Sequence, residues 1–501
     1  MLDHHVVLQQ EETLDPLSWD QYQTLGQQMV ADLLAYTRSV ADRPVWQPPT
    51  AAVKEQLTTA LPQAPTDLAT VYADFLTTIL PFANGNAHPL FFSWVHGTGT
   101  FSGALADFLA SAMNANLGVG DHGAVYVERQ VINWCKELMG FPPASSGLLV
   151  SGGSMANINA LAVARNAYRS GLLRQAGVLG TTGPLMVYCS TETHNCIAKA
   201  VDLLGLGTDN LRRIPVTAHY QIDLVLLRQQ VAADRVQGLL PFCLIGNAGT
   251  VNTGAIDPLT ELAEFSRQEG LWFHVDGAFG AIAKLVPEYQ AALRGIEAAD
   301  SVAFDFHKWL YVNYEAGCVL IKDAALHRDA FRQPANYLAQ HERGLAAGPE
   351  PFGNYGLELS RGFKSLKIWV SLREHGAEKY ARLVRQNIAQ AFYLGELVTQ
   401  APALELLTPV TLNIVCYRFN PGGLNEDDLN RLNKELLMTL QERGLAAPSY
   451  TVLGDRYAIR AAITNHRTTK RYLHRLIMHS SVLGQELHRQ LFAPSQPTAK
   501  S

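Results

Sequence analysis

Residues 301–310 read Ser-Val-Ala-Phe-Asp-Phe-His-Lys-Trp-Leu, an apolar and β-prone run that ends in a polar cluster containing Lys308. A lysine directly after a buried strand is energetically costly unless it has a partner or a chemical role. A second run of this kind, residues 271–278, ends in Asp276. The separation between Asp276 and Lys308 suits one strand–helix–strand unit, so we expect both side chains at strand ends.

A carboxylate and a lysine at strand ends are the groups that pyridoxal 5'-phosphate (PLP) chemistry requires. The lysine holds the cofactor as a Schiff base, and the carboxylate keeps the pyridine nitrogen protonated. We therefore interpret Lys308 as the Schiff-base residue and Asp276 as the partner of the ring. Desolvation should also lower the pKa of the Lys308 amine. The alternatives are a surface lysine at a strand end and a carboxylate that caps a helix or a turn.

The chain alternates strand-like and helical runs from residue 148 to about residue 325. This alternation predicts an α/β fold whose mostly parallel sheet carries helices on both faces. The polar clusters follow the strands, at the sheet edge where open α/β sheets bind ligands. A long helical run after residue 363, followed by strands near 410–418 and 457–462, predicts a smaller C-terminal α+β domain.

Ser-Gly-Gly-Ser at residues 151–154 opens a helix rich in alanine. Glycine lets backbone amides approach an anion, and the N-terminus of a helix favours negative charge. Such a turn is a weak signal by itself, because capped helices after glycine turns are common. In the presence of Lys308, it indicates a phosphate cradle that uses Gly153 and Ser154.

These residues and their flanks resemble the group II PLP-dependent amino-acid decarboxylases, in the aromatic-L-amino-acid decarboxylase branch. The resemblance extends over about residues 16–485, and it implies the PLP-dependent transferase type I (aspartate aminotransferase-like) fold. The segments that carry it most clearly are 88–96, 191–200, 272–320 and 360–370.

The resemblance also implies further cofactor-binding residues. His194 would stack on the cofactor ring, and Asn247 stands where the family has a threonine near the ring hydroxyl. Ala278 follows Asp276 in the matching segment. His307 and Asp305 would lie near the phosphate, although the family often has asparagine in place of Asp305. An ionised aspartate beside a phosphate would be repelled, so it needs a bridging donor or a side chain turned away.

The resemblance implies decarboxylation of an L-amino acid, expected to be aromatic, to an amine and carbon dioxide. Tyr337, in a loop that would close over the active site of the neighbouring subunit, would help to protonate the former α-carbon. Two alternatives remain at this point. One is an aldehyde synthase that uses PLP and oxygen, and the other is a non-catalytic homologue. The presence of both Tyr337 and His194 favours simple decarboxylation.

The substrate pocket is expected to include Trp94, His96 and Asn116. In one interpretation, an aromatic amino acid binds against Trp94 and its neighbouring phenylalanines. In the other, the pocket is more polar and reads a hydrogen-bonding group on the substrate, which discriminates strongly between substrates. The polar candidates are His96, Asn116, Asp121 and His122.

We expect three domains: a helical arm at 1–85, a large PLP-binding domain at 86–380 and a small α+β domain at 381–501. Apolar residues between Trp19 and Val40 recur in steps of three and four, which is typical of an amphipathic helix. The resemblance implies that this arm wraps around the partner of a homodimer with shared active sites.

The composition excludes several classes of function. A net charge of −5 gives no basic field for nucleic acid or an anionic membrane. The six cysteines include no Cys-x-x-Cys spacing, so we expect reduced thiols, no metal and a cytoplasmic location. No apolar run reaches the length of about 18 residues that a membrane span needs.

Overall fold

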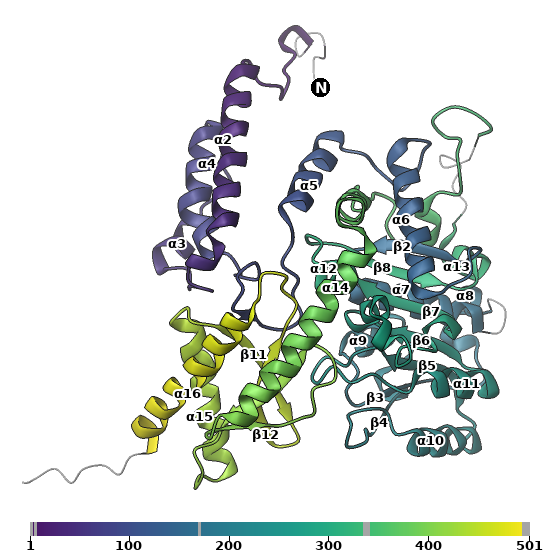
Figure 1. Ribbon diagram of the computed structural model, residues 1–501. Helices are drawn as coiled ribbons and strands as arrows, with labels where there is room; N and C mark the ends of the chain where they lie inside the picture. The colour runs from purple at the N-terminus through teal and green to yellow at the C-terminus, as the bar shows by residue number, and fades with distance from the viewer. Residues whose placement is uncertain (1–3, 5–7, 169–171, 334–340, 493–501) are drawn as a thin grey trace, which may run out of the picture.

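The computed structural model describes residues 4, 8–168, 172–333 and 341–492. In this part of the chain, two β-sheets form the body of the molecule, and a helical arm near the N-terminus stands apart from both (Figure 1). The arm consists of α2 (Trp19–Arg38), α3 (Ala51–Gln56) and α4 (Leu68–Asp74).

The larger sheet has seven strands in the order β2-β8-β7-β6-β5-β3-β4. Strands β4, β3, β5, β6 and β7 run parallel, whereas β8 is antiparallel to both of its neighbours, β2 and β7. The prediction of a mostly parallel sheet is confirmed. The bounds are β2 Ser146–Val150, β3 Leu185–Ser190, β4 Leu211–Ile214, β5 Leu240–Asn247, β6 Trp272–Asp276, β7 Ser301–Asp305 and β8 Gly317–Ile321.

Helices cover both faces of this sheet, and β5 shows how. Leu244 packs in one buried cluster with Leu259 of α11, while Cys243 packs in another with Ile197 of α9. Because both faces are covered, the strand is apolar up to its last residue, Asn247, instead of alternating. The helices of this region are α6 (Gly123–Met139), α7 (Gly153–Ala167), α8 (Leu172–Ala176), α9 (Cys196–Leu203), α10 (Leu224–Val236), α11 (Leu259–Glu269), α12 (Phe306–Trp309) and α13 (Ala324–Phe331).

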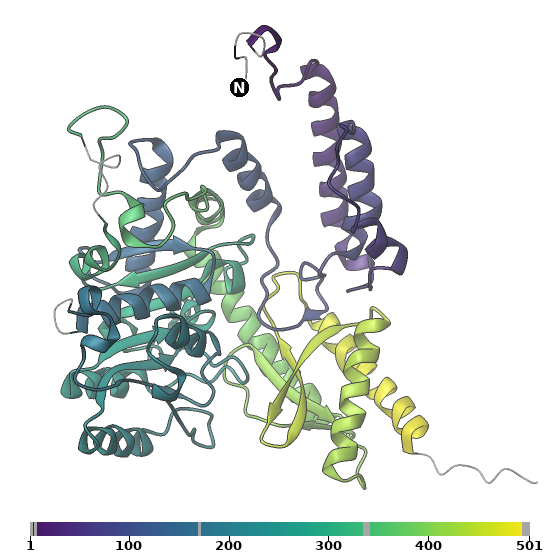
Figure 2. The same cartoon turned by 180° about the vertical axis from the view of Figure 1, so that it is seen from behind.

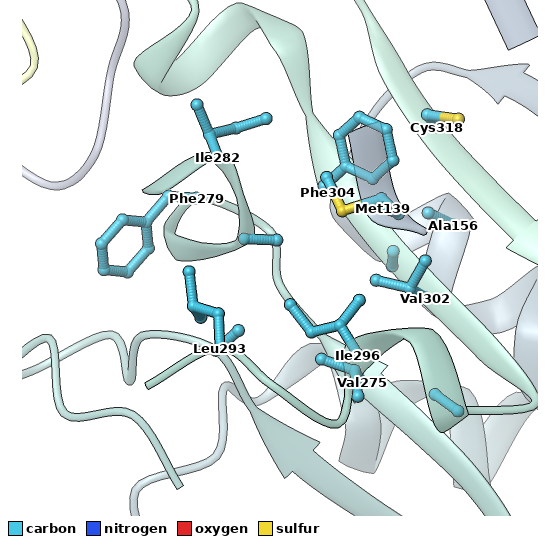
Figure 3. Close-up of a cluster of buried hydrophobic side chains, with 14 of the residues drawn as sticks. Met139, Ala156, Val275, Phe279, Ile282, Leu293, Ile296, Val302, Phe304 and Cys318 are labelled. Carbon is cyan, nitrogen blue, oxygen red and sulfur yellow. The ribbon is translucent and has the colours of Figure 1, made fainter. Parts of the chain in front are cut away.

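The core fixes the strands that carry the polar clusters. Figure 3 shows Val302 and Phe304 of β7 beside Val275 of β6 and Met139 of α6, all of them buried side chains. Every residue of β7 is buried. A strand packed in this way is close to rigid, because protein interiors are as dense as organic crystals. The backbone that leads into Lys308 is therefore held in place from both faces of the sheet.

The smaller sheet has the strand order β1-β11-β12-β10-β9. Its first strand, Phe91–Phe92, lies far away in sequence and pairs in parallel with β11. The segment expected to open the large domain thus joins the smaller sheet. Figure 2 shows α15 and α16 beside this sheet. The bounds are β1 Phe91–Phe92, β9 Leu404–Leu406, β10 Ile414–Phe419, β11 Ala447–Leu453, β12 Arg456–Ala462, α5 Phe101–Met113, α14 Ser365–Gln400, α15 Glu426–Glu442 and α16 Lys470–Phe492.

The arm is held together by few contacts of its own. Helix α2 spans 20 residues and buries none of them. The Tyr72 hydroxyl of α4 donates a hydrogen bond of 2.9 Å to Asp32 of α2. Helix α4 ends at Asp74, and the chain continues as a π-helical turn from Phe75 to Ile79. In the described residues, no helix is long and apolar enough to cross a membrane.

Candidate active site

A cavity of about 640 Å³ lies at the carboxyl ends of the parallel strands. Three of these ends are neighbours in the sheet. Asn247 at the end of β5 is the register partner of Asp276 at the end of β6. Strand β6 pairs in turn with β7, which ends at Asp305. The cavity is lined by these predicted site residues: Trp94, His96, Gly153, Ser154, His194, Asn247, Asp276, Ala278, Asp305, His307 and Lys308.

Lys308 projects from α12, the single helical turn that follows β7. Its Nζ lies 2.9 Å from Asp305 Oδ2. Burial lowers the pKa of the Lys308 amine, but the carboxylates of Asp305 and Asp276 outweigh burial and raise this pKa above its ordinary value. The expectation of a lowered pKa is therefore wrong for the protein without cofactor. The physical reason is the ion pair with Asp305, which the sequence did not reveal.

Asp276 ends β6 with its carboxylate at the cavity wall. Oδ1 accepts a hydrogen bond of 3.1 Å from the Ala278 amide, and Oδ2 lies 3.9 Å from the Cys196 thiol. The backbone bond fixes the orientation of the carboxylate, while the weak thiol contact leaves Oδ2 available to another donor. This geometry fits an acid that pairs with a protonated ring nitrogen.

His194 lies in the turn between β3 and α9. Its Nδ1 accepts a hydrogen bond of 3.2 Å from the Cys196 amide, so the neutral ring carries its proton on Nε2. Burial lowers the pKa of the His194 imidazole, although the charge of Asp276 acts in the opposite direction. A neutral imidazole with one N–H donor therefore lines the cavity beside Asp276.

Side chains at the turn before α7 would crowd the neighbouring residues. A Cβ on Gly153 would lie 3.0 Å from Asp305 Oδ2, and a Cβ on Gly152 would lie 3.1 Å from the His307 ring. Helix α7 begins at Gly153 and runs for 15 residues. Its first backbone amides have no intrahelical acceptor, so they are suited to bind an anion. The residues fit a phosphate group at this place.

His307 contributes one further donor to the cradle. Its Nδ1 accepts a hydrogen bond of 3.0 Å from the Ala316 amide, which places the proton of the neutral ring on Nε2. That Nε2 lies 3.7 Å from Asp305 Oδ2. Burial lowers the pKa of the His307 imidazole despite the opposing charge of Asp305. The ring is therefore held in one tautomer with its N–H on the cavity side.

The amide nitrogen of Asn247 is engaged by other parts of the protein. It donates hydrogen bonds of 2.7 Å to Asp257 Oδ2 and 2.9 Å to Thr193 Oγ1. In this amide orientation, the side chain offers its oxygen to a ligand in the cavity. Burial raises the pKa of Asp257 to about 6, and hydrogen bonds from Asn247 work against that rise.

The predicted substrate residues are not all brought together. Trp94 and His96 line the cavity, with ring centroids 5.1 Å apart. Asn116 is not among the residues that line this cavity. Its Oδ1 instead accepts hydrogen bonds of 2.9 Å from the amides of Gly118 and Arg361. Within one chain, the structure does not support Asn116 as a substrate residue. Tyr337 lies outside the described residues.

The other polar substrate candidates also bond elsewhere. Asp121 accepts a hydrogen bond of 2.6 Å from the Tyr126 hydroxyl, and the His122 ring lies 3.0 Å from the Asn116 carbonyl oxygen. Of the polar set, only His96 is among the residues that line the cavity. Its ring is 3.2 Å from the Asn84 amide nitrogen.

Tyr314 and Arg460 are among the cavity residues that the sequence did not reveal. Tyr314 lies six positions after Lys308, with its ring centroid 4.3 Å from that of His307, and its closeness in sequence could have identified it. Arg460 comes from β12 of the smaller sheet, and no local signal marks it. It donates a hydrogen bond of 2.8 Å to the Trp94 carbonyl and another of 3.2 Å to that of Asn252. Burial lowers the pKa of Arg460 to about 10.

The described residues contain no cluster of three or more histidine, cysteine or acidic side chains arranged to hold a metal ion. All six cysteines are unpaired and buried. The groups that line the cavity include an amine, carboxylates, imidazoles, a thiol and an anion cradle.

Comparison with known proteins agrees with this arrangement. Residues 49–420 match the family described as the pyridoxal-dependent decarboxylase conserved domain. The chain is 34% identical to the aromatic-L-amino-acid decarboxylase of Bacillus atrophaeus, over 94% of this chain and 97% of the relative. It is 29% identical to the phenylacetaldehyde synthase of Arabidopsis thaliana, over 92% of this chain and 95% of that protein.

A solved structure with a similar fold is Oryza sativa TDC with PLP and tryptamine. It superposes with a TM-score of 0.88 at 25% identity, covering 95% of this chain and all of that chain. The cavity described above and this neighbour point to the same fold and the same cofactor.

Proposed function

This chain belongs to the pyridoxal-dependent decarboxylase family and is a PLP-dependent amino-acid decarboxylase, and we propose that its substrate is an aromatic L-amino acid. The observation that carries the decarboxylase assignment is that one cavity contains both Lys308 and Asp276, near the ends of neighbouring strands. The similarity to the aromatic-L-amino-acid decarboxylase of Bacillus atrophaeus supports the aromatic substrate class.

PLP, when bound, withdraws electrons from the α-carbon so that the substrate carboxylate can leave as carbon dioxide. We propose that Lys308 binds the cofactor covalently and that Asp276 holds a proton at the pyridine nitrogen. The backbone amides of Gly153 and Ser154 and the Nε2 proton of His307 would bind the phosphate. Each of these groups lines the cavity.

The remaining predicted residues would orient the reacting groups. We propose that His194 covers the ring and directs its N–H toward the substrate carboxylate. Asn247 would accept from the ring hydroxyl through its side-chain oxygen, and Ala278 is small enough to leave room beside the ring. Tyr337, a prediction outside the described residues, would return a proton to the α-carbon.

Trp94 and His96 would form the side-chain pocket of the substrate. Trp94 is 57% exposed, and its ring is 6.5 Å from that of Phe91 between centroids. Exposed aromatic surface in a cavity favours an aromatic ligand, since ring pairs contribute beyond the area that they bury. His96 is the side chain placed to read a polar group on that ligand. We therefore favour an aromatic pocket in which His96 hydrogen-bonds a polar group of the substrate.

We also propose a homodimer. The arm stands apart from the two sheets (Figure 1), and several of its apolar side chains are exposed. Exposed apolar side chains on a segment that stands apart favour an interaction site. A second copy of the chain is the partner that the family resemblance implies. The exposed apolar side chains include Trp19, Tyr22, Val30, Leu68, Val71 and Ile79 on the arm and Leu105, Phe108, Leu109 and Met113 on α5.

The division into domains at 1–85, 86–380 and 381–501 is likewise proposed. A buried cluster confined to the smaller sheet and the elements packed on it supports this division, although the larger cluster also extends to Ile414 of β10 and Ala462 of β12. Helix α14 crosses residue 380, and it is interrupted at Gly376, whose φ of 71° is left-handed. Strand β1 connects the second and third parts. We propose a cytoplasmic location as well, supported by the six unpaired cysteines.

The experiment that tests the proposed function follows amine, aldehyde and hydrogen peroxide released from phenylalanine, tyrosine, tryptophan, DOPA, histidine, glutamate and leucine. We expect one amine per carbon dioxide, no stoichiometric peroxide and the highest kcat/KM on an aromatic substrate. Stoichiometric peroxide and aldehyde would favour the activity named for the Arabidopsis relative. Preference for glutamate or leucine would overturn the aromatic assignment.

His96→Ala separates the two accounts of substrate selection. If His96 reads a polar group, this variant loses kcat/KM on hydroxylated or indole substrates and retains it on phenylalanine. Equal losses on all three would show that His96 only fills space.

A further inference from the structure

Trp94 has a backbone conformation that is uncommon for its residue type. Its φ is 51°, in the left-handed region, where the Cβ of an L-residue is crowded. A residue other than glycine keeps such a conformation only where its surroundings hold it there. Trp94 lies two residues after strand β1, and it lines the cavity. The groups that hold its backbone therefore also determine where its ring lies.

The amide and the carbonyl of Trp94 are both bonded to side chains of the smaller sheet. The amide donates a hydrogen bond of 3.2 Å to Ser449 Oγ of β11, and the carbonyl accepts one of 2.8 Å from Arg460 Nη1 of β12. The same Nη1 donates a bond of 3.2 Å to Ser449 Oγ. Because Arg460 and Ser449 are both buried, these bonds form a closed set that fixes the Trp94 backbone.

The Arg460 guanidinium also holds a second segment of the cavity wall. Its Nε donates a hydrogen bond of 3.2 Å to the Asn252 carbonyl, and its Nη2 donates to the Val251 carbonyl. Residues 251 and 252 line the cavity a few positions after β5, which ends at Asn247. Each acceptor is a backbone carbonyl or a hydroxyl, so the bonds fix where the two segments lie. The guanidinium is suited to this, because it presents its donors in one rigid plane.

We propose that Arg460 is a positioning residue for substrate selection. By holding the Trp94 backbone against residues 251–252, it places the Trp94 ring and thereby sets the size of the aromatic ring that the cavity accepts. Arg460 acts through Trp94 and not by contact with the substrate. Displacement of a pocket wall by about 1 Å is enough for a large change in binding or rate. The inference rests on the proposed aromatic substrate class.

Arg460→Lys tests the proposal, because lysine keeps the charge but has one nitrogen and cannot bridge both segments. The dissociation constants of phenethylamine, tyramine and tryptamine are measured by absorbance titration of the PLP-loaded protein. These amines lack a carboxylate, so their binding reports on the pocket for the ring. We expect the ratio of the tryptamine Kd to the phenethylamine Kd to change by about fivefold or more in the variant.

Two results of this titration would overturn the proposal. One is a Kd ratio that Arg460→Lys leaves unchanged. The other is a loss confined to amino-acid substrates, with the affinities of all three amines preserved, which would mean that Arg460 binds the substrate carboxylate directly. Arg456→Lys on the same strand is the matched control, since Arg456 is not among the residues that line the cavity. It should leave the Kd ratio as in the unmodified protein, and an equal change in this control would also contradict the proposal.

A double-mutant cycle shows whether Arg460 acts through Trp94. Trp94→Ala removes the ring that the guanidinium is proposed to place. In the Trp94→Ala background, Arg460→Lys should therefore change the Kd ratio by less than about twofold, because residues that act as one unit give effects that do not add. The same change in both backgrounds would show that Arg460 selects the ring without Trp94, and the proposal would fail.

Ser449→Ala covers the case in which Arg460→Lys does not fold. It removes the acceptor of the Trp94 amide and should also change the Kd ratio, and an unchanged ratio in this variant would then overturn the proposal. The titration separates this inference from the proposed function. If none of the amines binds the unmodified protein, the aromatic substrate class is refuted and the inference falls with it. If the amines bind and the variants leave their ratio unchanged, only the inference is refuted.

Discussion

Arg361 and Glu128 form a buried ion pair, with 2.6 Å between Nη2 and Oε1 and side chains that are 3% and 0% exposed. The same guanidinium donates to the Leu149 carbonyl at 2.6 Å, just before the turn that leads to the anion cradle. The Arg361 carbonyl also accepts a hydrogen bond of 2.8 Å from the Leu117 amide. The pair therefore connects α6, β2 and the loop at 116–118.

Removal of one partner should be strongly destabilising. Glu128→Ala leaves the guanidinium buried without its counter-ion, so we expect the free energy of unfolding to fall by about 3–5 kcal/mol. Denaturation by urea at fixed protein concentration measures this loss. The control is the double variant Glu128→Leu/Arg361→Met. Its loss in the free energy of unfolding should be smaller than the sum of the losses in Glu128→Leu and Arg361→Met. An additive loss would mean that the two charges do not interact.

Buried neutral histidines should make the protein sensitive to acid. Burial lowers the pKa of His327 to about 3, and its ring lies 2.8 Å from Ser146 Oγ and 3.1 Å from Asn159 Oδ1. The unfolded chain binds the proton near pH 6.5, so the stability from the neutral ring is present above that pH and is lost as the pH falls toward 3. The slope is at most about 1.4 kcal/mol per pH unit for each such histidine.

His327→Gln should reduce this slope, which urea denaturation between pH 4 and pH 7 measures. Exposed His219 provides the control, and His219→Gln should leave the slope unchanged. His274 adds to the same effect, since burial also lowers its pKa to about 3. A stability that stays constant from pH 7 to pH 4 in the unmodified protein would contradict the account.

Asp276→Asn tests the partner of the cofactor ring. Asparagine keeps the size and accepts the Ala278 amide bond, but it cannot stabilise a protonated pyridine nitrogen. We expect kcat to fall by about a hundredfold or more, with PLP still bound in the visible spectrum. Unchanged kcat would show that Asp276 does not tune the cofactor.

Deletion of residues 1–42 tests the dimer. Removal of α2 uncovers the apolar side of α4, so we expect loss of the dimer in sedimentation together with loss of activity. Deletion of residues 1–15, which leaves α2 intact, is the control and should preserve both. A monomer with full activity after the longer deletion would refute the composite site.

The catalytic face of the fold could be predicted from the sequence because its residues follow strands directly. Asp276 and Lys308 each end an apolar run, and the order of strands and helices fixes the sheet edge at which such ends meet. Strands β4 and β8 were harder to identify. Strand β4 is short and includes two arginines, and antiparallel β8 follows the Lys308 turn without an intervening long helix.

Other features depend on contacts between distant parts of the chain. The Phe91–Phe92 strand pairs with residues 447 and 448, and Arg460 reaches the cavity from β12. The raised pKa of the Lys308 amine follows from a side-chain orientation of Asp305 that no pattern encodes. Asn116 has the polarity of a substrate residue, but its amide oxygen is used by the backbone of Arg361. A polar side chain in a loop is expected to form hydrogen bonds, but the sequence does not show whether the partner is a substrate or the protein backbone.

The most direct test of the central claim is covalent labelling of the cofactor lysine in an active preparation. The protein is loaded with PLP, reduced with borohydride and digested, and the labelled peptide is identified by mass spectrometry beside an assay of amine release. We expect a yellow protein, a phosphopyridoxyl group on Lys308 and an amine formed from an aromatic amino acid, with label and activity both lost in Lys308→Ala. A protein that stays colourless and inactive with added PLP, or a label on another lysine, would contradict the account.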